Sequence, residues 1–256
     1  MDDFEEKQLR VKEGTARIDA DGMNYRTLNA LMKSLGGNGV KKIELYNVCG
    51  QRYIGTGLGD LTVEVHGTPG NDLGAFMKGP NIAVCGNVQD GCGNTMDEGK
   101  IVIHGQAGDI AGYSMRGGSI FIRDDVGYRA GIHMKEYQEK MPTIVVGGTA
   151  QDFLGEYMAG GVLVVLGLTL PDGLEHSARF VGTGMHGGKI YIRGKVKNPA
   201  DDVEVTDLNE DDKQLLHSLV SEFCNYFNFD KASIMTQSFS KLVPLSKRPY
   251  GKLYAT

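Results

Sequence analysis

A glycine followed three positions later by a methionine occurs six times in this chain, and this repeat constrains the fold more than any other feature. The first four of these glycines follow one another at a constant step of 19, and the next two steps are 24 and 27. One further step of 19 back leads to Gly55, with Leu58 in the methionine position. A period of roughly 20 residues is typical of a solenoid, in which each repeat stacks on its neighbours. The repeat residues are Gly55, Gly74, Gly93, Gly112, Gly131, Gly155 and Gly182, with Met77, Met96, Met115, Met134, Met158 and Met185.

Short runs rich in valine and isoleucine alternate with these pairs. Each run is short, rich in valine and isoleucine and bounded by glycine, which is typical of a strand. A repeat this short leaves no room for a crossover helix between parallel strands. We therefore predict an all-β core over residues 41–194, a parallel β-helix of about seven coils spaced ~4.8 Å apart. The runs are 61–67, 81–86, 100–105, 119–124, 143–148, 162–167 and 189–194.

Glycine and methionine have separate structural roles in this prediction. The chain has 37 glycines, about twice the usual ~7%, and glycine reaches the positive φ that tight corners require. Methionine is flexible and fills irregular interior space. We expect the methionines to form a ladder inside the core rather than a metal or redox site.

Alternation within the runs assigns their faces. Arg123 and Arg193 must point to solvent, so the isoleucines beside them point inward. Two positions earlier in each run, a second outward column is mostly apolar, and stacking would make it contiguous. A patch of that size requires a cover, either from the chain's own terminal helices or from a partner protein. This predicted interface consists of Val102, Phe121, Ile144, Val164 and Tyr191.

The two ends of the chain have a different pattern. Residues 1–40 form an N-terminal segment with one predicted helix, which Asn24 caps and Gly36 ends. Residues 195–207 are polar and are predicted to be a linker. Residues 208–256 form a helical segment and tail, in which Asn209 caps an amphipathic helix and a second short helix covers 231–240. We expect these helices to plug an end of the core or to cover its apolar outer column.

Composition excludes several classes of protein. The net charge is −5 with no basic block, so nucleic acid is a poor partner. The acidic residues 1–6 do not resemble a signal peptide, and the longest apolar run, 162–168, is too short to span a membrane. The four cysteines lie apart without a C-x-x-C pair, which argues against a zinc ribbon or an iron–sulfur cluster. They suit a reducing compartment, so we predict a cytoplasmic protein.

Two columns of polar residues are candidate functional sites. His66, Cys85 and His104 stand at equivalent positions of successive repeats and are residue types that bind zinc or copper. A straight row does not converge on one ion, so we favour partly exposed strand residues without a ligand. Asp90 and Asp109 could bind calcium or perform acid–base chemistry. We favour Asx-turns at the corners, which use the same residue types. The full second column is Asn71, Asp90, Asp109, Tyr128, Asp152 and Arg179.

The segment Gly55-Thr56-Gly57-Leu58-Gly59 invites interpretation as a phosphate-binding loop. Such a loop requires a following helix, and here a strand follows. The sequence therefore predicts no catalytic, cofactor-binding or metal-binding residues, and no tightly bound flavin or metal.

Several segments resemble the C-terminal domain of the glutamate synthase large subunit. They are 47–52, 105–109, 155–161 and 184–188, together with 211–213 and 239–244 in the tail. The same glycine-patterned repeat is shared by one of the subunits of formylmethanofuran dehydrogenase. The resemblance covers roughly residues 15–245.

This resemblance implies a right-handed parallel β-helix that holds no flavin, no iron–sulfur cluster and no glutaminase nucleophile. It also implies that the domain packs between a glutaminase domain and a flavin-bearing synthase domain, where it helps to shape the path of ammonia. No cysteine follows Met1, so we expect glutaminase, FMN and iron–sulfur clusters on partner subunits. The favoured function is a non-catalytic structural subunit of a split glutamate synthase, with self-association also open. The alternatives are a β-helix subunit of a formylmethanofuran dehydrogenase-like or other redox complex, and an independent sugar-acting enzyme.

Overall fold

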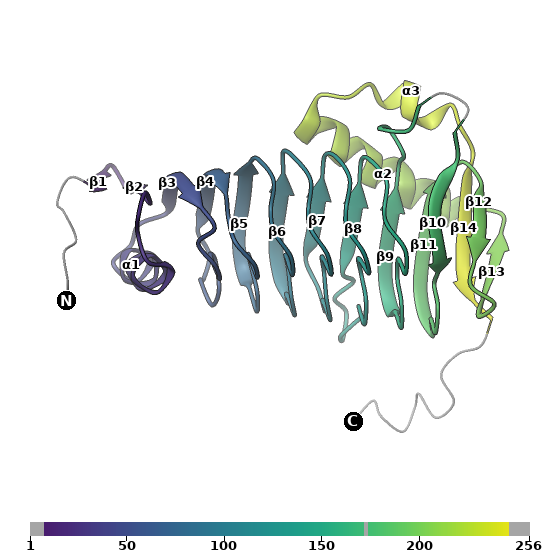
Figure 1. Cartoon of the computed structure of the whole chain (residues 1–256), viewed down its shortest axis with the longest axis horizontal. Coiled ribbons are helices and arrows are strands. Elements are labelled where there is room, and N and C mark those ends of the chain that lie inside the picture. The colour runs from purple at the N-terminus through teal and green to yellow at the C-terminus, as the bar shows by residue number, and fades with distance from the viewer. Residues whose placement is uncertain (1–7, 172–173, 246–256) are drawn as a thin grey trace.

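The computed structural model describes residues 8–171 and 174–245, which form an elongated, mostly β stack of repeats (Figure 1). Most of its strands belong to one twelve-stranded sheet of the described residues. Their spatial order is β1 (Leu9–Lys12), β2 (Thr15–Asp19), β3 (Lys42–Cys49), β4 (Thr62–Thr68), β5 (Lys78–Cys85), β6 (Glu98–Ile103), β7 (Ser119–Ile122), β8 (Thr143–Val146), β9 (Ala159–Val165), β11 (Gly187–Arg193), β14 (Phe239–Pro244) and β13 (Val203–Thr206).

The middle of this sheet is parallel and its two ends are antiparallel. Strands β2 to β9 and then β11 pair in parallel, with Ile82 beside Ile101 and Ile101 beside Ile120, so the period of the sequence repeat is the register of the sheet. At one end β1 pairs antiparallel with β2, and at the other β14 and β13 reverse direction against β11. All seven runs predicted as strands are strands.

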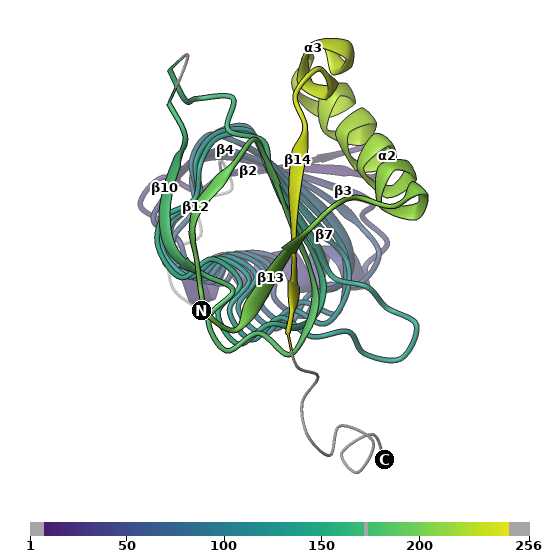
Figure 2. The ribbon, with the colours of Figure 1, turned by 90° about the vertical axis from the view of Figure 1, so that its right-hand side faces the viewer.

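A second, smaller set of pairings lies elsewhere in each repeat. Strands β10 (His176–Val181) and β12 (Val196–Pro199) form a two-stranded parallel sheet. Single bridges join Val88, Ala107, Val126 and Ala150 from one repeat to the next. Figure 2, a view along the stack, shows the repeats lying behind one another around one interior.

That interior is a continuous apolar core. Repeat methionines such as Met96 and Met115 are fully buried, between the inward isoleucines of the sheet. At the N-terminal end, α1 (Tyr25–Gly37) adds Leu28, Met32 and Leu35 to the same core. The predicted cap is confirmed, because the Asn24 side chain accepts the N–H of Arg26. Helix α1 therefore covers the N-terminal end of the stack.

Each repeat glycine is the centre of a turn in which every second residue is left-handed. Around Gly112 the φ values of Ile110, Gly112 and Ser114 are +53°, +70° and +51°. The flanking N–H groups donate to the next repeat, whereas the Gly112 N–H donates back to Cys92. A Cβ at Gly112 would overlap the δ-methyl of Ile144, so only the centre requires glycine. The same alternation surrounds the other six repeat glycines.

The predicted linker at 195–207 was wrong, because β12 and β13 lie within it. These strands form edges of the sheets, so their residues are largely exposed and polar, and only Val203 of β13 is buried. The predicted C-terminal helices are α2 (Glu210–Phe227) and α3 (Lys231–Met235), and α3 ends five residues before the predicted 240. The prediction also missed β14, and residues 246–256 of the predicted tail lie outside the described residues. Residues 1–7 of the predicted N-terminal segment also lie outside the described residues. The described part of that segment contains β1 and β2 in addition to the predicted helix.

Candidate functional site

The outer face of the sheet, the side that carries Phe121 and Tyr191, is covered by α2 and α3 over its C-terminal half (Figure 1). Phe121, Val164 and Tyr191 are fully buried beneath these helices, and Val102 is also buried. The covering side chains are Leu216, Val220, Phe223 and Cys224 of α2 and Ile234 of α3. The chain itself thus covers most of the predicted apolar interface.

Ile144 was wrongly assigned to this outer face. In β8, Ile144 pairs with inward Ile120, and Val145 is the residue beside Phe121. The run 143–148 ends in two glycines. Aligning this run with the others by its first glycine, Gly147, shifts the alignment by one residue and so assigns every side chain to the opposite face of the strand. Gly147 occupies the place of Arg123 in the preceding repeat, and a Cβ there would lie 2.5 Å from Phe223 Cζ. Gly147 therefore makes room for α2.

Two charged groups tie α2 to the sheet. The fully buried Asp212 accepts hydrogen bonds from Lys189 and Tyr191 on β11 and from Lys241 on β14, and it closes a capping box with Asn209. Near the other end of α2, Lys100 of β6 pairs with Glu222 and donates to Tyr226 Oη at 2.8 Å.

Towards the N-terminal end, the outer face of β2 to β4 carries charged side chains instead. Glu44 accepts from Arg17 Nε and Lys42 Nζ at 2.7 Å each, and Lys42 Nζ is also 2.9 Å from Glu64 Oε2. Hydrogen bonds from Lys42 and then Arg17 lower the pKa of Glu44 to about 2. Lys42 is also the main cause of a lowered pKa at Glu64. Each charge in this network faces a partner of opposite sign.

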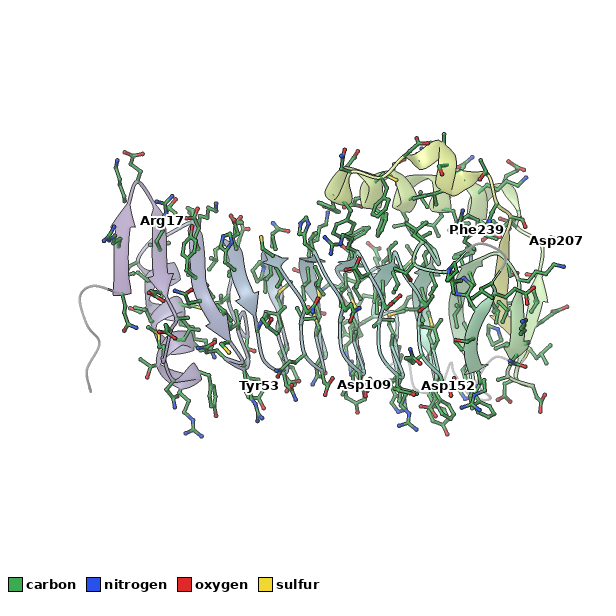
Figure 3. The ribbon with its side chains drawn as sticks, turned by 45° about the horizontal axis from the view of Figure 1, so that its top comes forward. Arg17, Tyr53, Asp109, Asp152, Asp207 and Phe239 are labelled. Atoms are coloured by element: carbon green, nitrogen blue, oxygen red, sulfur yellow. The ribbon has the colours of Figure 1, made fainter. Side chains whose placement is uncertain are left out.

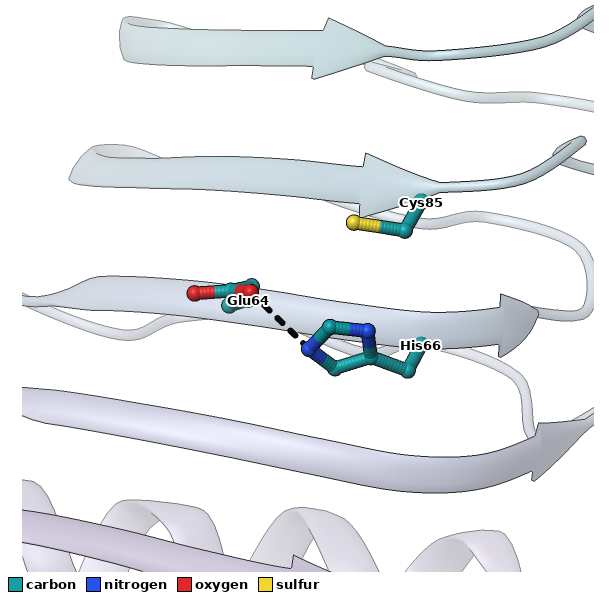
Figure 4. A group of neighbouring side chains, drawn as sticks. All are labelled: Glu64, His66 and Cys85. Carbon is teal, nitrogen blue, oxygen red and sulfur yellow. Dashed lines mark ion pairs between the residues drawn. The ribbon is translucent and has the colours of Figure 1, made fainter.

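Glu64, His66 and Cys85 come together at the end of this network (Figure 4). His66 Nε2 lies 2.9 Å from Glu64 Oε1, and the register of β4 and β5 places Cys85 directly beside His66. Partial desolvation and then the Glu64 charge raise the pKa of the Cys85 thiol. His104, the third member of the predicted row, packs its ring against Phe227 of α2 instead. The group in the structure therefore contains Glu64 where the predicted row contained His104. Glu64 does not occupy the repeat position that His66, Cys85 and His104 share.

The acidic column joins successive repeats. Asp90 Oδ1 accepts the N–H of Asp109 at 2.9 Å, and Asp109 Oδ1 accepts the N–H of Tyr128 at 2.8 Å. Asp152 accepts hydrogen bonds from the backbone N–H and from the guanidinium of Arg179. Figure 3 labels Asp109 and Asp152 along one edge of the stack. The Asx-turn prediction was therefore wrong in detail for these residues, because each carboxylate reaches an amide one full repeat ahead rather than one in its own turn. These carboxylates satisfy backbone donors between repeats.

Residues on either side of the repeat glycines form an exposed ridge, the turn edge. At these left-handed positions stand Tyr53, Phe76, Tyr157 and Phe180, each 40–61% exposed. Phe153 and Phe180 stack with ring centroids 5.0 Å apart. Sequence periodicity could have located this ridge, since its members lie two positions before or after each repeat glycine. Exposed aromatic side chains are enriched at protein interfaces.

The glycine-rich segment 55–59 forms no phosphate cradle. Gly55 and Gly57 occupy the same left-handed turn as in the other repeats, and β4 follows rather than a helix. A Cβ at Gly55 would lie 2.5 Å from Ile82 Cδ1, so the glycine accommodates core packing. In the described part of the chain, no helix is long and apolar enough to cross a membrane.

Comparison with known proteins identifies the family. The model of the GXGXG motif family matches residues 41–247. An uncharacterized protein of Methanocaldococcus jannaschii is 49% identical over 248 residues, covering 93% of this chain and 95% of that protein. The chain belongs to the GXGXG motif family, the family of the glutamate synthase GXGXG domain.

Proposed function

We propose that this member of the GXGXG motif family is a non-catalytic structural subunit of a split glutamate synthase. The observation that carries the proposal is the family match, which runs over residues 41–247 and so includes nearly the whole described stack. The archaeal relative supports it, because 95% of that protein's length aligns with this chain.

We further propose that the stack is a right-handed parallel β-helix of about seven coils. Parallel pairing from β2 through β9 to β11 supports this, as does the recurring left-handed turn at the seven repeat glycines. The antiparallel strands β1, β13 and β14 would then be end caps. Such caps satisfy strand edges that would otherwise pair with other chains.

The polar residues of the stack support a structural role. The carboxylates of Asp90, Asp109 and Asp152 bind backbone N–H groups of the next repeat. The buried Asp212 holds α2 in place. Groups engaged in this way stabilise a rigid stack, which suits a subunit that sets the distance between two others.

The partners in this proposal are a glutaminase chain and a synthase chain that carries FMN and iron–sulfur clusters. The turn edge is the proposed contact surface, because its exposed aromatic rings lie on a rigid frame. Bridging the two chains would keep ammonia on a path between them. The four thiols are free, which agrees with the proposed cytoplasmic location.

Isolation of the native complex tests this proposal. The tagged chain is purified from its own cells under gentle conditions, and the co-purified chains are identified by mass spectrometry. The proposal expects a glutaminase and an FMN-containing synthase in stoichiometric amounts, together with flavin absorbance. A complex built around a molybdenum or tungsten enzyme, or a chain that purifies alone, would refute it.

A further inference from the structure

Three metal-ligating side chains of different types converge on the outer face at β4 and β5 (Figure 4). Glu64 and His66 lie two residues apart on β4 and so point to the same side of the sheet, and Cys85 adds a third group from β5. Their ligand atoms all lie within 4.8 Å of one another. This convergence comes from strand register, which fixes Cys85 beside His66.

The contact between Glu64 and His66 lacks a satisfactory proton arrangement. His66 Nε2 is 2.9 Å from Glu64 Oε1, yet it is shielded from solvent and has no hydrogen-bond partner of acceptable geometry. Two lone-pair atoms at this distance are stabilised by a cation between them. With a zinc ion ~2.0–2.1 Å from each atom, the angle between the oxygen, the zinc and the nitrogen would be roughly 90°.

We propose that Glu64, His66 and Cys85 bind Zn²⁺, with a fourth coordination position open to water. The donor set of carboxylate oxygen, imidazole nitrogen and thiolate sulfur is one that zinc accepts. Three protein ligands and one water are the arrangement of zinc sites that keep an open position. On binding, the Cys85 thiol releases its proton to solvent and its sulfur bonds to the metal. This inference does not rest on the proposed function.

Neighbouring side chains hold the ligands in place. Lys42 Nζ lies 2.9 Å from Glu64 Oε2, the oxygen that does not face His66, so it orients the carboxylate without occupying the site. The His66 ring stacks on Tyr46 with centroids 4.6 Å apart and an interplanar angle of 2°. Tyr46 in turn donates to Glu44 at 3.2 Å. Such outer contacts fix ligand orientation in metal sites.

The proposal differs from the sequence-based expectation that the chain binds no metal tightly. That expectation rested on the absence of a converged ligand set, because His66, Cys85 and His104 were expected to form a straight row. The structure diverts His104 to Phe227 and supplies Glu64 in its place. Cys85 is exposed, so an ion reaches the site directly from solvent.

Titration of the reduced, metal-free, full-length protein with Co²⁺ and then Zn²⁺ tests the proposal. Visible and near-ultraviolet absorption reports Co²⁺, and equilibrium dialysis with elemental analysis gives the Zn²⁺ stoichiometry. We expect one equivalent of either ion and a thiolate-to-cobalt charge-transfer band. Cys85→Ser should abolish the band, and Cys85→Ser, His66→Gln and Glu64→Gln should each weaken Zn²⁺ binding by at least about tenfold.

Cys49→Ser is the matched control, because Cys49 is another exposed thiol on the neighbouring strand β3 that lies outside the cluster. It should bind both ions like the wild type. Circular dichroism of each variant checks that the fold is kept. Absence of Zn²⁺ binding by the folded wild type, or unchanged binding in Cys85→Ser and Glu64→Gln, would overturn the proposal.

Discussion

Tyr191 Oη donates a hydrogen bond of 2.7 Å to Asp212 Oδ1, and both side chains are fully buried. The bond joins the outer face of β11 to the first turn of α2, where Asp212 also accepts the N–H of Asn209. One carboxylate therefore starts the helix and fixes it on the sheet. Hydrogen bonds from Lys189 and Lys241 balance its charge.

Asp212→Asn should destabilise the protein by about 3 kcal/mol, because it leaves Lys241, only 12% exposed, without its carboxylate. Tyr191→Phe should cost about 1 kcal/mol, since it removes a single hydrogen bond. The matched control is Lys213→Gln, which breaks an exposed pair with Glu210 and should cost less than about 0.5 kcal/mol. Urea unfolding measures all three. Equal effects of Asp212→Asn and Lys213→Gln would contradict the docking role of Asp212.

The same carboxylate predicts a dependence of stability on pH. Burial raises the pKa of Asp212, but the hydrogen bonds from Lys241, Tyr191 and Lys189 outweigh burial and hold this pKa well below its ordinary value of 3.8. Stability from a lowered folded-state pKa is complete above the unfolded value and is lost as pH falls through the folded value. The stability difference between wild type and Asp212→Asn should therefore be constant near neutral pH and shrink below about pH 4. A difference that grows on acidification would refute this account.

Gly112→Ala should destabilise by about 2–4 kcal/mol, from left-handed strain and from overlap with the δ-methyl of Ile144. Ile144→Val removes that methyl group, so the double variant should lose less than the sum of the two single variants. Gly22→Ala, with φ of +64° and no atom within 4 Å of the added Cβ, isolates the strain alone. Additive costs measured by urea unfolding would show that the methyl contact is unimportant.

Asp109→Asn should cost little, because the amide oxygen can still accept the N–H of Tyr128. Asp109→Ala removes this acceptor between repeats and should cost about 1 kcal/mol. Thermal unfolding of the two variants, compared with Gly112→Ala, ranks these effects. If Asp109→Asn proved the most damaging of the three, a role for the carboxylate charge would replace the structural one.

Phe223→Ala should cost about 3–5 kcal/mol and expose the outer face to a hydrophobic dye, because Phe223 is fully buried over Gly147. Phe180→Ala is the control, since Phe180 is 49% exposed. Deletion of 208–256 would be a less specific test of the cover, because it also removes β14 from the sheet. Unchanged stability and dye binding in Phe223→Ala would mean that α2 is not the cover.

The sequence was most informative for residues whose surroundings recur in every repeat. The period revealed the inward isoleucines, the buried methionines and the glycine turns, because each repeat packs against near-copies of itself. The error at Ile144 arose in one of the longer repeats, where the strand must be aligned from its start rather than from Gly147. Periodicity also failed for β13 and β14, whose antiparallel pairings join residues distant in sequence. Strand β12 was missed although it pairs with β10 at about the repeat period.

The cluster of Glu64, His66 and Cys85 was missed for a related reason. A column drawn at the repeat period compares equivalent positions, whereas this cluster combines two residues of β4 with one residue of β5. The apolar cover was anticipated in part, because the stripe on α2 was visible as a helical pattern of apolar residues. The tether at Asp212 was hidden, since its partners Tyr191 and Lys241 lie on two other elements.

Reconstitution of glutamate synthesis tests the central proposal most directly. The glutaminase and FMN-bearing synthase chains from the same genome are purified separately, and glutamate formation from glutamine is measured with and without this chain. The account predicts that the chain raises the glutamine-dependent rate several-fold, while the rate with free ammonia stays unchanged. Full glutamine-dependent synthesis in its absence, with no change on its addition, would contradict the account.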